Sequence, residues 1–399
     1  MENKGVCNFR VQGFRVAAIA SGLKASGALD LALIFSEKEA ACAGVFTTNK
    51  VKAAPVLLTM ENIRRGTARA ILVNSGNANA CTGPKGIANA RETAHMVADL
   101  LEIEPYEVLV ASTGVIGLPL NMEAITLALP RLKECLATEG LDKVAQAIMT
   151  TDKFPKIRAA RGKANGKAYS VVAVAKGAGM IMPNMATMLC FVLTDLKIGP
   201  EDLGNVLNQS VSKTFNRITV DGDTSTNDCV LALANGTAGN RDLSSKGLEE
   251  FQQNLETIMK GLALDIVRDG EGATKVVEVV VRGARDKEEA LEAARTISNS
   301  ALVKTAFYGE DPNWGRIMAA LGRAEIHMDP GDVDIWINDI QIVSQGIGMG
   351  IENEKKAAQV MVEEEFTLTV DLNQGTMEES MWTCDLTHDY VSINAEYRT

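Results

Sequence analysis

The sequence predicts an α/β (α+β) protein in which mixed sheets are layered with helices. Short runs rich in β-branched and apolar residues alternate with segments of helical spacing through both halves of the chain. With 399 residues, of which 46% are hydrophobic and 23% charged, the chain can bury a large core. The sequence has no internal repeat and no obvious linker, so we expect the strands and helices to form one interlocked body.

The strands are predicted from apolar runs that end in small residues or glycine. In the first half these runs are ARAILVNSG (68–76), EVLVAST (107–113) and YSVVAVAKG (169–177). Two later runs are KVVEVVVRG (275–283) and EFTLTVDL (365–372). The last run alternates apolar and polar residues, which predicts a half-exposed strand.

Four helices are predicted from apolar residues three and four positions apart. They cover residues 87–104, a segment from Pro200, a segment from Asp242 and residues 286–303. The apolar positions are Leu203, Val206, Leu207, Val211 and Phe215 in the second, and Leu248, Phe251, Leu255, Ile258 and Met259 in the third. His95 falls in the first, where we expect an ordinary helix residue rather than a metal ligand.

Composition excludes several classes of function. The net charge of −11 argues against a nucleic-acid partner, which would require a basic surface. Seven scattered cysteines without a CxxC pair indicate reduced thiols and a cytoplasmic protein. The N-terminal MENKGVCNFRVQGF has no long apolar stretch, so no signal peptide is expected. Three histidines leave little material for a metal site or a Ser-His-Asp triad, and no metal is expected.

The segment KGAGMIMPNMATMLCFVLTD (176–195) has no charge between its two ends. Its uncharged part is at the lower limit of a membrane span, but its glycines and Pro183 make a spanning helix unfavourable. We therefore expect no membrane segment, and instead a glycine turn followed by a buried strand in MLCFVLT. Thr187 is a small hydroxyl residue among these apolar side chains.

Other short motifs give weaker indications. The glycine-rich segments 83–90 and 162–169 lack the pattern of a phosphate-binding loop. The acidic run VDGDTSTNDC (220–229) lacks the spacing of an EF-hand, so we expect a turn with Asx hydrogen bonds. STGVIG (112–117) follows a predicted strand, and the backbone N–H groups of such a turn can stabilise an oxyanion. Most turns of this kind are only structural.

With so few histidines, a hydroxyl nucleophile would need another base. The α-amino group of an N-terminal threonine can serve, because its pKa of about 7.7–8.0 suits neutral pH. Thr187 is internal, so it could act in this way only after cleavage of the bond between Ala186 and Thr187. The residues alone do not establish that cleavage.

Several segments in one order resemble the ornithine acetyltransferase family (glutamate N-acetyltransferase, ArgJ), and the resemblance extends over essentially the whole chain. Besides residues 176–195, these segments are GVFTTNKVKAAPV (44–56), VNSGNANACTG (73–83), ASTGVIG (111–117), IMTTD (148–152), RDGEGATK (268–275), FYGEDPNWGRI (307–317) and SINAEYRT (392–399).

The resemblance implies an autoprocessed, N-terminal-nucleophile-type acyltransferase of arginine biosynthesis. The precursor would cut itself into an α fragment, Met1–Ala186, and a β fragment, Thr187–Thr399, which stay together as one catalytic body. N-acetylornithine would then acetylate Thr187 and release ornithine, and glutamate would take the acetyl group to give N-acetylglutamate. This is ping-pong covalent catalysis.

The resemblance also implies roles for individual residues. Thr187 would be the nucleophile with its own amino group as base, and Thr113 and Gly114 would supply backbone or hydroxyl donors to the oxyanion. The implied substrate contacts are Thr150, Lys176, Thr187, Glu271, Asn394 and Thr399. Lys176 would bind a substrate carboxylate, and Glu271 the side-chain ammonium of ornithine. Without the resemblance, Lys176 would be interpreted as a solvated strand end and Glu271 as a helix cap.

Further expectations concern partners. No cofactor is expected, but acetyl-CoA as a second acetyl donor, which would make the enzyme multifunctional, is left open by the sequence. The resemblance implies an α2β2 heterotetramer or larger. The alternatives are a related autoprocessed amidohydrolase or aminopeptidase, and a non-catalytic α/β binding protein.

Overall fold

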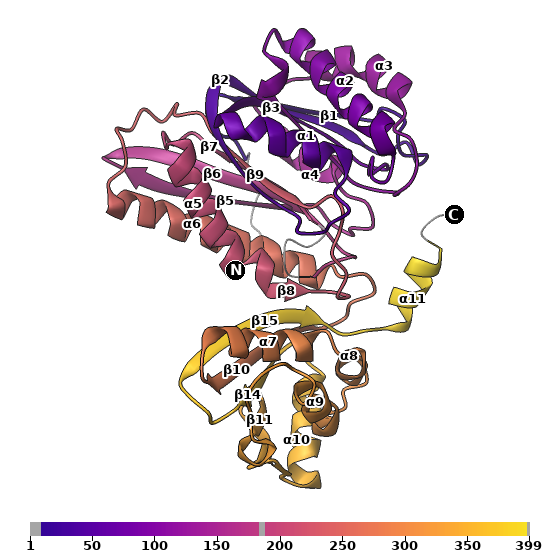
Figure 1. Cartoon of the computed structure of the whole chain (residues 1–399), viewed down its shortest axis with the longest axis vertical. Helices are drawn as coiled ribbons and strands as arrows, with labels where there is room; N and C mark the ends of the chain where they lie inside the picture. Colours follow the sequence, from indigo (N-terminus) through magenta and orange to yellow (C-terminus); the bar gives the residue numbers. More distant parts are fainter. Residues whose placement is uncertain (1–8, 183–187, 397–399) are drawn as a thin grey trace. The chain divides into compact units, whose positions relative to one another are not determined.

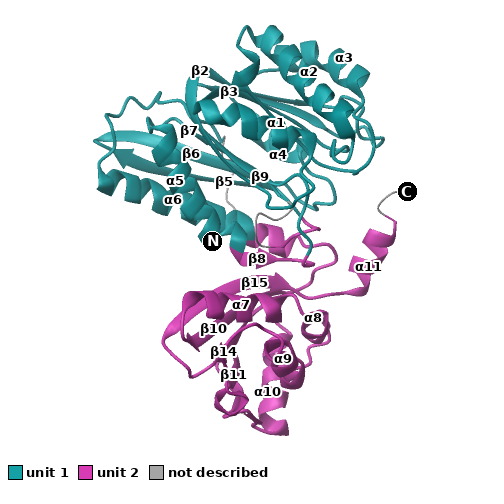
Figure 2. Cartoon of the chain, in the orientation of Figure 1, with its two compact units in different colours: residues 1–177, 184–216, 223–263 teal, residues 178–183, 217–222, 264–399 magenta. Residues whose placement is uncertain are grey.

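The structure, a computed structural model, describes residues 9–182 and 188–396 (Figure 1). It contains two mixed sheets with helices, which confirms the α/β prediction. The chain forms two compact units (Figure 2): unit 1 comprises residues 1–177, 184–216 and 223–263, and unit 2 comprises residues 178–183, 217–222 and 264–399. The units do not follow the predicted fragment boundary, since unit 1 takes long segments from both sides of Ala186–Thr187.

Within the described residues, unit 1 is built on an eight-stranded sheet in the order β4-β3-β2-β9-β7-β6-β5, with β1 added beside β2. The strands are β1 Phe14–Ile19, β2 Leu31–Phe46, β3 Thr67–Asn74, β4 Val108–Ser112, β5 Lys156–Ala164, β6 Lys167–Lys176, β7 Leu189–Thr194 and β9 Cys229–Ala234. The pairs β3–β4 and β7–β9 are parallel, and the other pairs are antiparallel.

Helices pack on the sheet of unit 1 because alternate residues of each strand face opposite sides. Leu31 and Leu33 belong to a core with helices α1 Ala54–Asn62, α2 Gly83–Leu101 and α3 Met122–Glu134. Ala32 and Ile34 belong to a second core with α4 Leu141–Ala147. Unit 1 also contains α5 Pro200–Lys213 and most of α6 Ser245–Arg268.

Unit 2 has, in its described part, a seven-stranded sheet in the order β13-β12-β11-β14-β10-β15-β8. Its strands are β8 Ile218–Thr219, β10 Val276–Ala284, β11 Asp334–Ile337, β12 Ile340–Ser344, β13 Ile347–Gly348, β14 Glu365–Asp371 and β15 Met377–Cys384. Its helices are α7 Lys287–Ser298, α8 Ala301–Tyr308, α9 Trp314–Leu321, α10 Ile351–Met361 and α11 His388–Ala395. Val277, Val279 and Val281 alternate along β10 and form the centre of its core.

All five predicted strands occur, as β3, β4, β6, β10 and β14. The predicted buried strand in MLCFVLT is β7, whose six residues are all buried. His95 lies exposed on α2, as an ordinary helix residue. No helix in the described part of the chain is long and apolar enough to cross a membrane.

Two helix predictions need correction. The predicted helix 286–303 is two helices, because Ser300 accepts a hydrogen bond from the Val303 amide and so begins α8 as its N-cap. The helix from Pro200 ends at Lys213, and Phe215 lies in a separate 3-10 turn, Phe215–Arg217.

Candidate active site

The predicted oxyanion turn lies where two parallel strands end. In the β3–β4 ladder Asn74 is paired with Ser112, so both strands end at one edge of the sheet. The Ser112 hydroxyl donates to Asn74 Oδ1 at 2.6 Å, and the Thr113 amide donates to the Asn74 carbonyl at 3.0 Å. These bonds join the start of the STG turn to the end of β3.

Gly114 is required by this geometry. Its φ is +131°, and an added Cβ would lie 2.4 Å from the carbonyl carbon of Gly76 and 2.6 Å from the amide nitrogen of Asn77. Among the described residues, none accepts a hydrogen bond from the Gly114 amide. Because the Thr113 amide is already bonded to Asn74, the donors that this turn can offer are the Thr113 hydroxyl and the Gly114 amide.

Lys176, the last residue of β6, brings two other predicted residues together. Its Nζ donates to Thr113 Oγ1 at 3.3 Å and to Thr150 Oγ1 at 2.8 Å. The residue is only 3% exposed, so the interpretation of Lys176 as a solvated strand end is wrong. A hydroxyl that accepts from an ammonium group becomes a stronger donor, which strengthens Thr113 as an oxyanion ligand.

Asp152 holds this cluster together, although its role was not predicted from the sequence. Its Oδ1 lies 2.8 Å from Lys156 Nζ, and its Oδ2 lies 3.9 Å from Lys176 Nζ. The amides of Gly177 and Thr150 donate to the same carboxylate. Burial raises the pKa of Asp152, but the charges of Lys176 and Lys156 and the hydrogen bonds from Lys156 and the Thr150 amide outweigh burial, and the pKa falls to about 2. Asp152 is therefore a buried carboxylate.

Unit 2 brings Glu271 and Asn394 together. Asn394, on α11, donates from Nδ2 to Glu271 Oε2 at 2.8 Å. The amide of Glu271 donates to the carbonyl of Ala178 at 2.9 Å. Gly179 makes room for the carboxylate, since a Cβ there would lie 2.4 Å from its carbon. Glu271 thus contacts a side chain of another element and does not cap a helix.

The predicted nucleophile Thr187, the cleavage-site residue Ala186 and the predicted substrate contact Thr399 lie outside the described residues. Their roles therefore stay predictions.

The acidic run 220–229 differs from its predicted local turn. The Ser225 hydroxyl does accept from the Asn227 amide at 3.0 Å, as in a local turn. Two of its carboxylates, Asp221 and Asp228, instead bind backbone far away in the chain. In unit 2, Asp221 accepts from the amides of Met180 and Ile181 at 2.6 and 2.8 Å. The sequence could not indicate this, because the partners lie about forty positions away in the chain.

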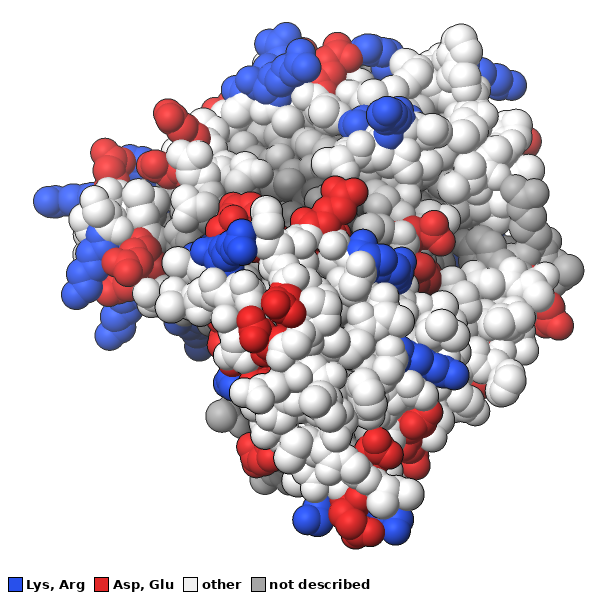
Figure 3. Space-filling view, turned by 60° about the horizontal axis from the view of Figure 1, so that its bottom comes forward, with Lys and Arg blue, Asp and Glu red and all other residues white. Residues whose placement is uncertain are grey.

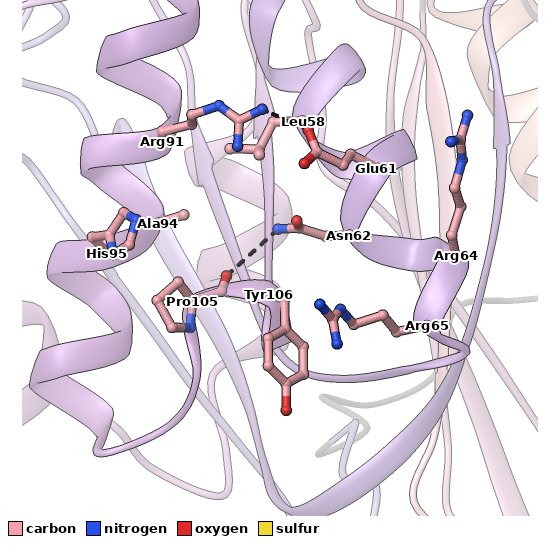
Figure 4. A pocket seen from close by; sticks show the side chains of 10 residues that line it. All are labelled: Leu58, Glu61, Asn62, Arg64, Arg65, Arg91, Ala94, His95, Pro105 and Tyr106. Atoms are coloured by element: carbon pink, nitrogen blue, oxygen red, sulfur yellow. Dashed lines mark hydrogen bonds and ion pairs between the residues drawn. The ribbon is translucent and has the colours of Figure 1, made fainter.

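A cavity of about 460 Å³ on unit 1 contains none of the predicted site residues (Figure 4). Its charged side chains interact with one another: Arg91 pairs with Glu61 at 2.6 Å, and the Arg65 guanidinium lies 4.2 Å from the centre of the Tyr106 ring. Asn62 in its wall donates to the carbonyl of Val108, at the start of β4, whereas the STG turn follows the end of β4. This cavity is therefore separate from the candidate active site.

The charged side chains form neither a patch of one sign on the face shown in Figure 3 nor a metal-binding cluster among the described residues. On the face drawn in Figure 3, basic and acidic side chains are interspersed. In the described part of the chain, no three His, Cys, Asp or Glu side chains are arranged to hold a metal ion.

Together, these features define an α/β protein in which a buried lysine donates to two threonine hydroxyls, one of them in a glycine turn, an arrangement suited to acyl chemistry on an anionic substrate. The chain belongs to the ArgJ family, whose family model matches residues 15–399. The predicted family is thus confirmed.

Two relatives indicate what the family contains. The arginine biosynthesis bifunctional protein ArgJ of Geobacter sulfurreducens is 52% identical over 391 residues, covering 98% of this chain and 100% of the relative. The glutamate N-acetyltransferase of Methanocaldococcus jannaschii is 48% identical over 392 residues, covering 95% and 96%. A solved structure of the bifunctional ArgJ protein from Bacillus halodurans is 42% identical and covers 51% of this chain and 97% of that chain, with a TM-score of 0.49.

Proposed function

We propose that this chain is a glutamate N-acetyltransferase of arginine biosynthesis that moves an acetyl group from N-acetylornithine to glutamate. Membership of the ArgJ family over nearly the whole chain supports the reaction. The observation in the structure that carries the proposal is the buried Lys176 ammonium, bonded to the hydroxyls of Thr113 and Thr150. It places a cation and two polarised hydroxyls beside the predicted oxyanion turn.

The enzyme first matures by self-cleavage. Thr187 Oγ attacks the carbonyl carbon of Ala186, the peptide C–N bond breaks, and the α-amino group of Thr187 takes the proton. Water then hydrolyses the ester and leaves the α fragment 1–186 and the β fragment 187–399. The sheet of unit 1 supports lasting association of the fragments, since β6 of the first pairs with β7 of the second, and β2 pairs with β9.

The acetyl transfer has two balanced steps. The Thr187 hydroxyl attacks the acetyl carbonyl of N-acetylornithine, its proton passes through the α-amino group to the departing amine, and ornithine leaves. The amine of glutamate then attacks the acetyl ester, the C–O bond breaks, and Thr187 Oγ regains a proton as N-acetylglutamate forms. An α-amino group with a pKa of about 7.7–8.0 can exchange these protons near neutral pH.

The remaining residues bind charge. The Thr113 hydroxyl and the Gly114 amide stabilise the oxyanion in both steps. Lys176, beside Thr150, binds a substrate carboxylate, and Glu271, oriented by Asn394, binds the side-chain ammonium of ornithine. Thr399 completes the substrate contacts in this proposal.

The proposal extends to the assembly and the compartment of the protein. We propose a heterotetramer of two α and two β fragments, so a native mass of about twice the 42.7 kDa chain would support it. A cytoplasmic location fits the thiols of the described part of the chain, which are all free. Acetyl-CoA is the second donor to test, in the assay below with acetyl-CoA in place of N-acetylornithine.

One assay separates the proposal from its rivals. Purified protein is incubated with N-acetylornithine and glutamate, and the products are quantified. The proposal expects N-acetylglutamate and ornithine in equal amounts. Acetate with ornithine would instead identify an amidohydrolase, and no turnover by correctly folded protein that stays uncleaved would identify a binding protein.

A further inference from the structure

The end of the acidic run, Ser225–Asp228, has no part in the proposed reaction, yet it is buried in unit 1 and bonded to several segments. The Ser225 carbonyl accepts from Thr47 Oγ1 at 2.7 Å, and the Thr226 carbonyl accepts from the Ala53 amide at 2.9 Å. The Asp228 carbonyl accepts from the Thr47 amide at 3.0 Å. The backbone of this short segment is therefore fixed, and its side chains have defined directions.

Asn227 uses its side chain to hold the oxyanion turn. Its Nδ2 donates to the carbonyl of Ala78 at 2.7 Å and to the carbonyl of Ser112 at 2.9 Å. Ser112 directly precedes Thr113, so this amide anchors the residue from which the turn begins. Both bonds are buried, where a lost partner is costly.

Asp228 uses its side chain to hold the residue that follows Thr187. Its Oδ1 accepts from the Met188 amide at 2.9 Å, and the next residue, Cys229, donates from its amide to the Met188 carbonyl at 3.2 Å. Met188 is thus held on both sides of its backbone before β7 begins.

The burial of Asp228 calls for an explanation. The residue is 1% exposed, and among the described residues no group lies within normal hydrogen-bond geometry of its Oδ2. Burial raises the pKa of Asp228 well above its ordinary value, against the opposing effects of the Met188 amide, the charge of Lys176 and the hydroxyl and amide of Ser225. A buried polar group of this kind costs free energy, so a role in holding the site would account for its presence.

We propose that Asp228 is a positioning residue, whose carboxyl fixes the Met188 amide and through it the backbone bonded to Thr187. The neighbouring Asn227 fixes Ser112 and so the donors of the turn. The adjacent residues Asn227 and Asp228 thereby fix the backbone before the oxyanion turn and the backbone that follows Thr187. The inference rests on the proposed function, because positioning by Asp228 affects the reaction only if Thr187 is the nucleophile.

The test compares Asp228→Ala with Asp228→Asn in the full-length chain. Cleavage is followed by denaturing mass spectrometry over time, and acetyl transfer is normalised to the cleaved fraction. The alanine variant should slow cleavage about 100-fold, the loss expected from a displacement near 1 Å, and should lower kcat while KM for N-acetylornithine changes less than about 3-fold. The asparagine variant keeps an acceptor for the Met188 amide and should stay within about 3-fold of wild type in both.

A core variant controls for simple loss of stability. Val144 is fully buried in α4, so Val144→Ala is the control. Each protein is assayed at the same number of degrees below its own thermal unfolding midpoint. It should cleave and transfer within about 3-fold of wild type. The proposal is overturned if Asp228→Ala cleaves at the wild-type rate, if Asp228→Asn is as slow as Asp228→Ala, or if Val144→Ala is equally slow. Cleavage by Thr187→Ala would refute the proposed function itself, whatever the Asp228 variants do.

Discussion

At the scale of single residues, the candidate site depends on charges that are buried together. Asp152 is shared between the ammonium groups of Lys156 and Lys176, at 2.8 and 3.9 Å, and all three side chains are almost fully buried. Buried ion pairs of this kind contribute little net stability, but they fix geometry and are costly to break. Here they fix the Lys176 ammonium beside Thr113 and Thr150.

Removing the charge of Asp152 should therefore destabilise the protein strongly. Asp152→Asn leaves two buried ammonium groups without this carboxylate, which we expect to cost about 3–5 kcal/mol. Urea unfolding of wild type and variant measures the difference. Asp99→Asn, exposed on α2, is the matched control and should change stability by less than about 0.5 kcal/mol. A loss below about 1 kcal/mol for Asp152→Asn would refute the role of this carboxylate.

The same residue predicts a dependence of stability on pH. The pKa of Asp152 is about 2 in the folded protein, below its ordinary 3.8, so the folded state binds its proton more weakly. Its contribution to stability is present above the ordinary pKa and is lost as the pH falls toward about 2. The stability difference between wild type and Asp152→Asn should shrink between pH 5 and pH 3. A constant difference over that range would contradict the assignment.

Gly114 can be tested within its own turn. In Gly114→Ala the new Cβ would meet backbone atoms at 2.4 and 2.6 Å, so the turn must move. We expect acetyl transfer to fall about 100-fold, because oxyanion donors act only at the correct distance. Gly117→Ala is the control: its φ is +87°, but no atom lies within 4 Å of an added Cβ. It should lose about 1–2 kcal/mol of stability and keep its activity. Equal activity losses in the two variants would show that the clash at Gly114 is irrelevant.

At the scale of helices and strands, the sequence predicts elements well where apolar residues are continuous. The runs 68–76, 107–113 and 169–177 became β3, β4 and β6 because their side chains are buried on both faces of a sheet. The long strand β2 was missed, because the exposed charged residues 37–39 interrupt its apolar pattern. The break between α7 and α8 was signalled by Ser300, a residue favoured as an N-cap.

The site was predicted less completely than the fold, for a physical reason. The STG turn is local and could be read from strand-end glycines and hydroxyl residues. The burial of Lys176 could not be predicted from the sequence, because a lysine at the end of a strand is usually solvated. Its partner Asp152 comes from another segment, just before β5, and lies near it because β5 pairs with β6. The resemblance to a family supplied Lys176 and Glu271, whereas Asp152 and Asp228 emerged only from the structure.

The strand pairing predicts how the cleaved fragments behave. Val171–Lys176 of β6 pairs with Leu189–Thr194 of β7, and Ala41–Phe46 of β2 pairs with Cys229–Ala234 of β9. Fragments that share a buried sheet cannot separate without exposing it, so both should elute together in native size-exclusion chromatography at any dilution. They should separate only in denaturant. Fragments that part in native buffer would mean that the sheet does not survive cleavage.

At the scale of the whole molecule, the predicted cleavage point and the division into units are different features. Unit 1 contains strands from both predicted fragments, and unit 2 takes the short segment 178–183 from the first. The acidic run contributes to both units, since Asp221 holds Met180 and Ile181 in unit 2 and Asp228 holds Met188 in unit 1. One run therefore supplies a carboxylate to Met180 and Ile181, upstream of the predicted cleavage point, and another to Met188, downstream of it.

The central claim is that Thr187 carries the acetyl group, and denaturing mass spectrometry tests it directly. Wild-type protein is incubated with N-acetylornithine alone, and glutamate is then added. We predict a β fragment that begins at Thr187, becomes heavier by one acetyl group, and loses that group when glutamate is present. Thr187→Ala should remain a single unmodified chain. A wild-type protein that forms N-acetylglutamate while it remains uncleaved, or whose β fragment is never acetylated, would contradict the mechanism.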